Sequence, residues 1–259
     1  MSNRENGIVK RFWRFVTKIG ALPRWEEYKH FFQIAYFRYL VVWFTLVPLL
    51  ASLLEGLQRP LVLQVGEHQL SFSLGLPFSW ELLWLSSLFF FLAYVVYVIF
   101  CPAFIKQYNQ YSEYSAYGHD PRWIAWQAKD VVEDPDMIAK FLERLRQKQY
   151  VTDVEESEYR RPQDGNPIVG EKQTTLYFSF EGNFYKLGMP IFGADGAEDE
   201  DAVRAIFWEI FGRYSASRVP WRWLVRALLV LSSICFLVVL GQHIAAGFYE
   251  VRHWLNLSS

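Results

Sequence analysis

The sequence predicts an integral membrane α-helical protein with three transmembrane helices and a small cytoplasmic α+β domain inserted between helices 2 and 3. Three uncharged stretches, residues 39–54, 82–105 and 227–249, predict the helices, because about 20 apolar residues cross a bilayer. Outside these stretches, residues 106–220 form the only segment long enough for a soluble domain. A hydrophobic fraction of 52% with 20% charged residues excludes a disordered or collagen-like chain.

Residues 1–38 are predicted to form a cytoplasmic, basic, amphipathic segment. Apolar side chains recur at helical spacing from Ile8 to Ile19, and Pro23 is expected to end that helix. The side chains expected to lie at the membrane interface are basic or aromatic, namely Lys10, Arg11, Trp13, Arg14 and Lys18. Anionic lipid is therefore an expected partner. The alternative is packing of this helix on the protein's own cytoplasmic domain, and the two interpretations can coexist.

The transmembrane helices are expected at residues 39–58, 80–105 and 221–249. Tryptophans near the ends of the second and third segments are typical of membrane interfaces. The first uncharged stretch is shorter than a bilayer requires, and flanking aromatic residues are expected to extend it. The alternative for each segment is a buried core helix.

The distribution of Lys and Arg predicts the orientation. There are eight in residues 1–38, one in 55–81, 16 in 106–226 and one after residue 249. Translocated loops are depleted in these residues, so we expect the N-terminus and the large middle segment in the cytoplasm and the C-terminus outside. The expected location is the plasma membrane, with a bacterial inner membrane favoured.

Two segments are predicted to lie outside the membrane. Residues 59–79 alternate apolar and polar side chains on both sides of Gly66-Glu67-His68, which indicates a β-hairpin. Residues 250–259 are expected to form an external tail.

The cytoplasmic domain, residues 106–220, is predicted to begin as a continuation of the second transmembrane helix through residues 106–117. Asp134 and Pro135 then favour a helix start, and apolar side chains at helical spacing predict a helix to about Lys148. Its predicted buried stripe is Ile138, Phe141, Leu142 and Leu145.

The second half of the domain is predicted to contain a hairpin and a helix. A strand is expected within residues 150–156, and alternation predicts another at 174–180, joined by a turn at Gly182-Asn183 to a strand at 184–187. Four acidic residues at 198–201 are expected in the first turn of a helix. Its predicted buried stripe is Val203, Ile206, Phe207 and Ile210.

The net charges of the two cytoplasmic segments have opposite signs. Residues 106–220 carry 14 basic and 20 acidic side chains, while residues 1–38 carry eight basic and three acidic ones. We expect the two segments to pack together. The chain as a whole has a net charge of −1, so no direct binding of nucleic acid is expected.

No set of residues in the sequence predicts catalysis, a metal or a cofactor. No glycine-rich phosphate loop and no paired histidines at metal-ligand spacing occur in the sequence. Cys101 and Cys235 both fall in predicted membrane helices and are expected to pack as small apolar side chains. His119-Asp120 resembles a metal-binding dyad but has no further ligands in the cytoplasmic segment. We therefore expect a non-enzymatic protein.

The outer end of the third helix is predicted to associate with other helices. Small residues allow close packing there, and two polar side chains can bond across helices. The residues concerned are Gly241, Gln242, His243, Ala245 and Gly247. A homo-oligomer is therefore expected.

The resulting hypothesis is an inner-membrane adaptor or regulatory subunit whose cytoplasmic domain binds a cytoplasmic protein and whose membrane helices oligomerise. The alternative is a membrane-disrupting effector of the phage-defence or toxin type, in which the cytoplasmic domain is the sensor that triggers permeabilisation. An enzyme acting on lipid is a third possibility, with His119, Asp120 and the acids at 198–201 as its candidate residues.

Overall fold

A computed structural model of the chain describes residues 22–33, 61–65, 68–72, 79–193 and 195–257, together with the helical positions Val42, Leu46, Leu50 and Leu53. The chain divides into two compact units. The first contains the long apolar helices, and the second comprises residues 24–26 and 101–219. The predicted interfacial residues Lys10, Arg11, Trp13, Arg14 and Lys18 lie outside the described residues.

The first unit is built on two long helices, α4 (Trp80–Phe100) and α10 (Val219–Leu257). In the part of the chain that the structure describes, these two are long and apolar enough to cross a membrane, with mean hydropathies of 2.3 and 2.5. Helix α10 continues eight residues beyond Tyr249. The external tail predicted at residues 250–259 is therefore helical as far as Leu257, and its place outside the membrane stays a prediction.

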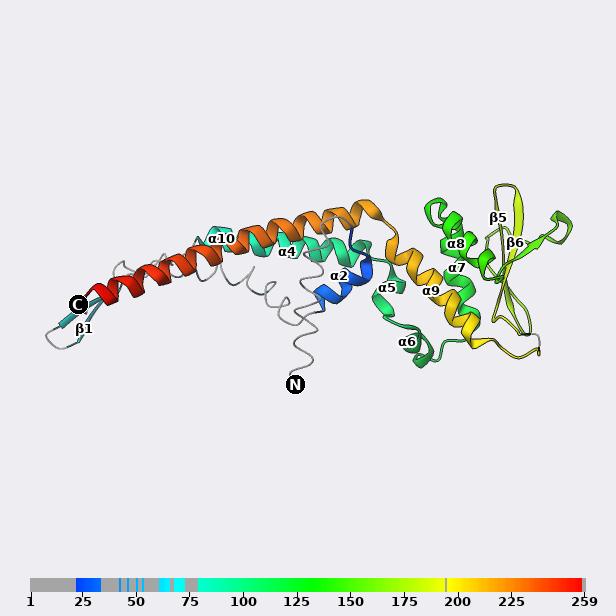
Figure 1. Cartoon of the computed structure of the whole chain (residues 1–259), viewed down its shortest axis with the longest axis horizontal. Coiled ribbons are helices and arrows are strands. Elements are labelled where there is room, and N and C mark those ends of the chain that lie inside the picture. The colour runs from blue at the N-terminus through cyan, green and yellow to red at the C-terminus, as the bar shows by residue number, and fades with distance from the viewer. Residues whose placement is uncertain are drawn as a thin grey trace. The chain divides into compact units, whose positions relative to one another are not determined.

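Helices α4 and α10 lie side by side and run antiparallel (Figure 1). At one end, the backbone N–H of Ser79 donates to Gln242 Oε1 at 2.9 Å, and at the other the rings of Phe100 and Trp221 stack with centroids 3.4 Å apart. These two contacts set the register of one helix against the other over the full length of α4.

A pair of buried serines joins the two helices between those ends. Ser86 Oγ donates to the carbonyl oxygen of Ser232 at 2.9 Å, and Ser232 Oγ donates to the carbonyl oxygen of Ser86 at the same distance. Ser87 differs, because its hydroxyl donates to the carbonyl oxygen of Leu83 in its own helix. The Ser86–Ser232 pair thus satisfies both hydroxyls across the helix–helix contact.

Helix α2 (Trp25–Phe32) packs on this pair through residues 27–32. The ring of Phe32 lies 5.7 Å from that of Phe90 and 5.0 Å from that of Tyr97, and the Tyr28 hydroxyl donates to the carbonyl oxygen of Arg222. Burial raises the pKa of Tyr28 above its ordinary value. This tyrosine is therefore a neutral hydrogen-bond donor.

Strands β1 (Leu61–Val65) and β2 (His68–Phe72) pair antiparallel, at the positions where the alternation predicts a hairpin. The membrane segment predicted at 39–58 is described only at four positions, Val42, Leu46, Leu50 and Leu53, which are helical and exposed. The rest of that segment lies outside the described residues, and its span stays a prediction.

The second unit begins where α4 ends. Cys101 and Pro102 separate α4 from α5 (Ala103–Gln107), and α6 (Tyr111–Ala116) follows. The prediction that residues 106–117 continue the membrane helix is therefore wrong. Proline lacks a backbone N–H and disfavours helix in the residue before it, which accounts for the break at Pro102.

Three further helices form the core of the second unit. After the 3₁₀ turn η1 (Pro121–Trp123), they are α7 (Ile124–Glu133), α8 (Pro135–Gln147) and α9 (Glu200–Ala216). The apolar side chains that the sequence predicts on the buried sides of α8 and α9 are buried in the structure. The predicted start of α8 is also confirmed, because Asp134 Oδ1 accepts from the backbone N–H of Asp136.

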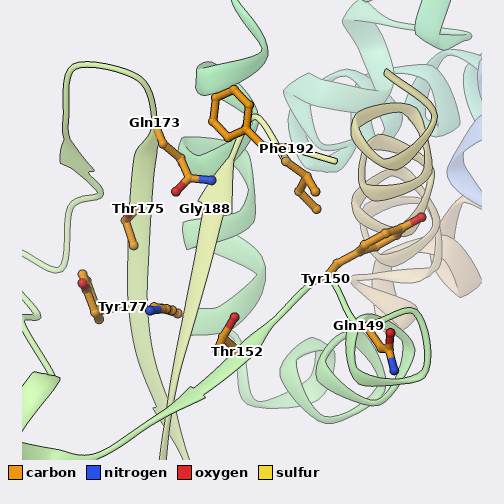
Figure 2. Close-up of a pocket in the computed structure, with 10 residues that line it drawn as sticks. Gln149, Tyr150, Thr152, Gln173, Thr175, Tyr177, Gly188 and Phe192 are labelled. Atoms are coloured by element: carbon orange, nitrogen blue, oxygen red, sulfur yellow. The ribbon is translucent and has the colours of Figure 1, made fainter. Parts of the chain in front are cut away.

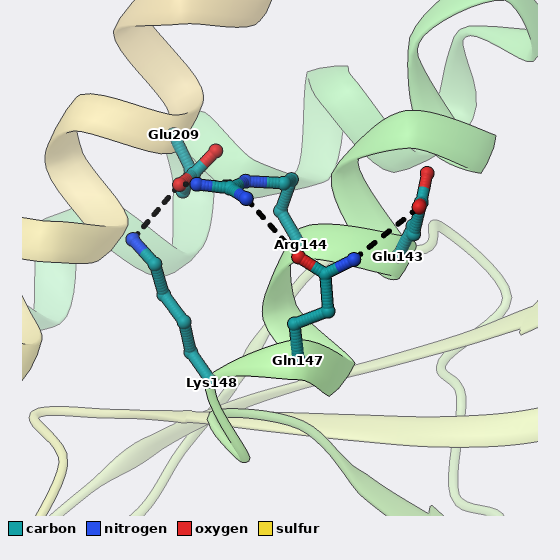
Figure 3. Close-up of polar contacts among 5 residues, drawn as sticks. All are labelled: Glu143, Arg144, Gln147, Lys148 and Glu209. Carbon is teal, nitrogen blue, oxygen red and sulfur yellow. Dashed lines mark hydrogen bonds and ion pairs between the residues drawn. The ribbon is translucent and has the colours of Figure 1, made fainter.

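An ionic cluster joins α8 to α9 (Figure 3). Glu209 of α9 lies 2.8 Å from Lys148 Nζ and 3.4 Å from Arg144 Nε, and its side chain is only 11% exposed. Burial alone would raise the pKa of Glu209, but the Lys148 hydrogen bond and the two positive charges outweigh burial and hold the pKa below its ordinary value of 4.5. Glu209 is therefore ionised at neutral pH.

The sheet has the order β3-β6-β5-β4 and is antiparallel throughout. Its strands are β3 (Thr152–Val154), β4 (Ile168–Val169), β5 (Thr174–Phe180) and β6 (Asn183–Met189). The turn between β5 and β6 comprises Glu181 and Gly182, both with positive φ. It lies one residue earlier than predicted, and the positive φ at both central positions is that of a two-residue hairpin turn of type I′.

The helices cover one face of this sheet. Helix α7 contacts β5 and β6, and α8 and α9 pack on α7. The strand residues that face the helices are buried, among them Leu176, Phe178, Tyr185 and Leu187. The second unit is therefore a small α+β domain in which a layer of three helices packs on one face of the sheet through α7.

Candidate ligand-binding site

The face of the sheet opposite α7 carries mostly polar side chains. Side chains alternate across a strand, so the residues between the buried ones of β5 and β6 lie on this opposite face. They include Thr175 and Tyr177 of β5 and Lys186 of β6, all partly exposed. We refer to this surface as the open face.

A recess forms on the open face where β3 separates from β6. Strand β6 runs to Met189, but β3 pairs only with residues 184–186. Beyond Lys186, no described strand pairs with the side of β6 that faces away from β5. The recess has a volume of about 320 Å³, at the lower end of the usual range for small-molecule sites.

The lining of the recess comes from three strands and the segments next to them. Figure 2 shows Thr175 and Tyr177 along β5, Gln173 just before this strand, and Thr152 on β3. Lys186 and Gly188 of β6 lie between them. The remaining walls are Gln149 and Tyr150 after α8, and Ile191 and Phe192 after β6.

Gly188 provides the space that Gln173 occupies. A Cβ added at Gly188 would overlap the side-chain amide of Gln173. Gln173 Nε2 donates at 2.8 Å to the carbonyl oxygen of Pro190, which fixes the amide at this end of the recess. A larger residue at position 188 would displace Gln173 and change the shape of the site.

Aromatic side chains gather near Tyr177. The ring of Tyr159 lies 4.5 Å from that of Phe184 and 6.1 Å from that of Tyr177, with rings tilted or edge-on. Such pairs stabilise by about 0.5–1.5 kcal/mol beyond their buried area. The segment around Tyr159 therefore covers part of the open face and limits the recess to the part beyond Tyr177.

The ionisable groups of the recess include one ammonium and no carboxylate. Lys186 makes no ion pair with any residue that the structure describes. Around it, Thr152, Thr175 and the two tyrosines supply hydroxyls, and Gln149 and Gln173 supply amides. All of these groups can donate hydrogen bonds, which favours an acceptor-rich ligand.

The site residues predicted from the sequence lie elsewhere. Gln242 accepts the hydrogen bond from Ser79 within the first unit. Gly241, His243, Ala245 and Gly247 are on exposed positions of α10. The structure contains one chain, so association of these residues with another copy stays a prediction.

His119 and Asp120, considered as a metal-binding dyad, have structural roles. His119 Nε2 lies 2.9 Å from the Tyr108 hydroxyl, and Asp120 Oδ1 accepts from the backbone N–H of Arg122 at the start of η1. No group of three or more potential metal ligands occurs among the described residues. In the acidic run, Asp199 Oδ1 accepts from the backbone N–H of Ala202 and caps α9.

The recess was not predicted from the sequence. Alternation in residues 174–180 and 184–187 was sufficient to place Thr175, Tyr177 and Lys186 on one face. The early departure of β3, and the packing of Gln173 over Gly188, depend on residues distant along the chain. No local pattern carries that information.

Comparisons of the chain with known protein families, with curated proteins and with solved structures find no match. Its function is therefore inferred from its sequence and geometry alone.

Proposed function

We propose that this chain is a non-enzymatic adaptor or regulatory subunit of a membrane, with the bacterial inner membrane favoured. In this proposal, α4, α10 and residues 39–58 cross the bilayer, and the α+β domain binds a protein partner in the cytoplasm. The observation that carries the proposal is the open face: in the described part of the domain, helices cover one side of the sheet only.

The surfaces of α4 and α10 support membrane insertion. Only 28% of the most apolar window of α4 and 22% of that of α10 are buried, whereas a core helix of a soluble protein is mostly buried. Exposed large apolar side chains include Leu92, Ile99, Ile234 and Leu237. Apolar surface on this scale is stabilised by lipid and disfavoured in water.

The basic and aromatic residues at the start of α10 support the proposed orientation. Arg218 directly precedes this helix, and its first turns contain two further arginines and two tryptophans, namely Arg222, Arg226, Trp221 and Trp223. Basic residues favour the cytoplasmic side and tryptophans the interface. Because α4 pairs antiparallel with α10, the C-terminal end of α4 lies on the same side of the membrane as the start of α10. The domain follows that end of α4 in the sequence.

Thiol labelling in intact cells tests the orientation. Single cysteines are introduced in a chain whose Cys101 and Cys235 are replaced by alanine. We expect Ser112→Cys, at an exposed position of α6, to react with a membrane-impermeant maleimide only after lysis, and Ser258→Cys to react in intact cells. Labelling of Ser112→Cys in intact cells would contradict the proposed orientation.

Photo-crosslinking tests the partner surface. A photoreactive phenylalanine analogue replaces Tyr177 on the open face and, as the matched control, Tyr117, which directly follows α6 and is 63% exposed. We expect a discrete cross-linked species with a second protein from position 177 and none from position 117. Equal cross-linking from both positions, or none from position 177, would remove the open face as the partner site.

A further inference from the structure

We infer that the recess on the open face binds a small organic anion that carries a planar ring. The ring would lie against Phe192 and Ile191, and the anionic group, a phosphate or a carboxylate, would lie at Lys186 among the threonine hydroxyls. This inference goes beyond the proposed partner and does not depend on it, because the purified chain alone suffices to test it.

The charge of the recess contrasts with that of the domain around it. Residues 106–220 carry six more acidic than basic side chains. Several basic side chains of the domain are in ion pairs, such as Lys148 and Arg144 with Glu209, and Arg146 with Asp153. Lys186 is in no ion pair among the described residues, and none of the residues that line the recess is acidic. An anionic ligand would give this ammonium a partner.

The hydrogen-bonding groups of the recess favour an anion over a cation. Thr152 and Thr175 lie on neighbouring sides of Lys186, since Thr152 is its partner in β3 and Thr175 pairs with Gly188 two residues further along β6. The ammonium, together with the hydroxyl on either side of it, can donate charge-assisted hydrogen bonds to a phosphate or carboxylate. A cation would find carbonyl and hydroxyl oxygens here but no carboxylate.

The recess is large enough for a small ligand with a ring. Its volume of about 320 Å³ accommodates a ring and an attached anionic group. Gln173, held by its bond to Pro190, closes one end, and Tyr177 with its aromatic neighbours closes the other. The partly exposed rings of Phe192 and Tyr150 offer apolar surface to the ring of the ligand.

Titration calorimetry of the full chain in lipid nanodiscs tests the inference with phenyl phosphate as the probe. We expect saturable binding in the millimolar range or tighter. Lys186→Gln removes the charge, and we expect the Kd to rise about 10- to 100-fold, as for the loss of one charge-assisted hydrogen bond. Lys140→Gln is the matched control, because Lys140 lies at an exposed position of α8 and not in the recess. This control variant should leave the Kd unchanged.

A second variant keeps the test decisive if Lys186→Gln does not fold. Thr175→Val retains the shape of the side chain and removes one donor, and we expect it to raise the Kd several-fold. Absence of saturable binding by the unaltered chain would overturn the inference, as would an unchanged Kd in the Thr175 and Lys186 variants. If benzyl alcohol bound as tightly as phenyl phosphate, the recess would not require an anionic group. If inorganic phosphate bound as tightly as phenyl phosphate, the recess would not require a ring.

Discussion

Ser86 and Ser232 donate hydrogen bonds to each other's carbonyl oxygens, and their hydroxyl oxygens lie 3.3 Å apart between the two ends of the α4–α10 contact. Each hydroxyl thus bonds to the neighbouring helix, whereas those of Ser87 and Ser233 bond within their own helices to the carbonyls of Leu83 and Leu229. Each bond requires the two serines to lie opposite each other. A shift of one helix along the other by one turn would therefore break both bonds.

Replacing either serine of this pair should destabilise the helix pair. We expect Ser86→Ala and Ser232→Ala each to lower the free energy of unfolding by about 0.5–1.5 kcal/mol, the range found for hydrogen bonds between membrane helices. The double variant should cost less than the sum, since the two bonds are coupled. Tryptophan fluorescence during denaturant titration in mixed micelles measures these energies. The control is Ser233→Ala, and a cost for it equal to that of Ser86→Ala would contradict the assignment.

The ionic cluster at Glu209 should make the stability of the domain depend on pH (Figure 3). The pKa of Glu209 is lowered in the folded protein, so its contribution is complete above the unfolded value of about 4.5 and is lost as the pH falls through the folded pKa. We expect Glu209→Gln to be less stable by about 1 kcal/mol at neutral pH. Denaturation at a series of pH values should show this difference shrinking below about pH 4.5.

The control for this prediction is Glu143→Gln. The carboxylate of Glu143 accepts a hydrogen bond from Gln147 on the same helix and is exposed. Its replacement should change stability by less than about 0.5 kcal/mol. If the Glu209 variant differed from the unaltered chain by the same amount at every pH, the loss would come from packing and not from charge.

Replacing Gln149 by glycine should increase the stability of the domain. Gln149 has a left-handed φ of 59°, and it follows α8 in a motif in which the N–H of Tyr150 donates to the carbonyl of Leu145 and its own N–H to that of Arg146. Glycine adopts this conformation without strain, so Gln149→Gly should stabilise the domain by about 0.5–1 kcal/mol. A thermal melt of the purified chain measures the gain. A lower melting temperature would show that the Gln149 side chain makes a stabilising contact.

Gly241 and Gly247 allow a test of association between copies. A Cβ at either position meets no atom within 4 Å in the described chain, so a larger residue should be tolerated by the single chain. If these glycines pack against a second copy, Gly241→Leu and Gly247→Leu should shift the mass of the detergent-solubilised protein toward the monomer. Light scattering measures this mass, and Ile234→Leu at another exposed position of α10 is the control. An unchanged oligomer in both glycine variants would exclude this surface.

The elements that the sequence predicts well are those whose cues are local. Asp134-Pro135 marks the start of α8, and the apolar spacing from Ile138 to Leu145 predicts its buried side. Helix α7 was missed, although Ala125, Ala128 and Val132 recur on one side. Its small side chains give a weak pattern, and its burial depends on the sheet and on the helices that pack against it.

The features that the sequence does not predict depend on contacts between distant residues. Ser86 and Ser232 are ordinary serines in two apolar segments, and only the helix register makes them partners. The recess likewise requires β3 to pair with residues 184–186 and no further. Local patterning predicts that Lys186 lies on a strand face, but not that this face opens into a binding site.

The Ser86–Ser232 pair also has a consequence for synthesis of the chain. Helix α4 leaves the ribosome first, and residues 101–218 must be translated before α10 begins at Val219. At roughly 5–20 residues per second, this delay lasts on the order of ten seconds. During that time the Ser86 hydroxyl has no partner in α10, and a bond to a carbonyl of its own helix, as Ser87 makes, is its alternative. Pairing of the two helices is thus a late step that follows the synthesis of the whole domain.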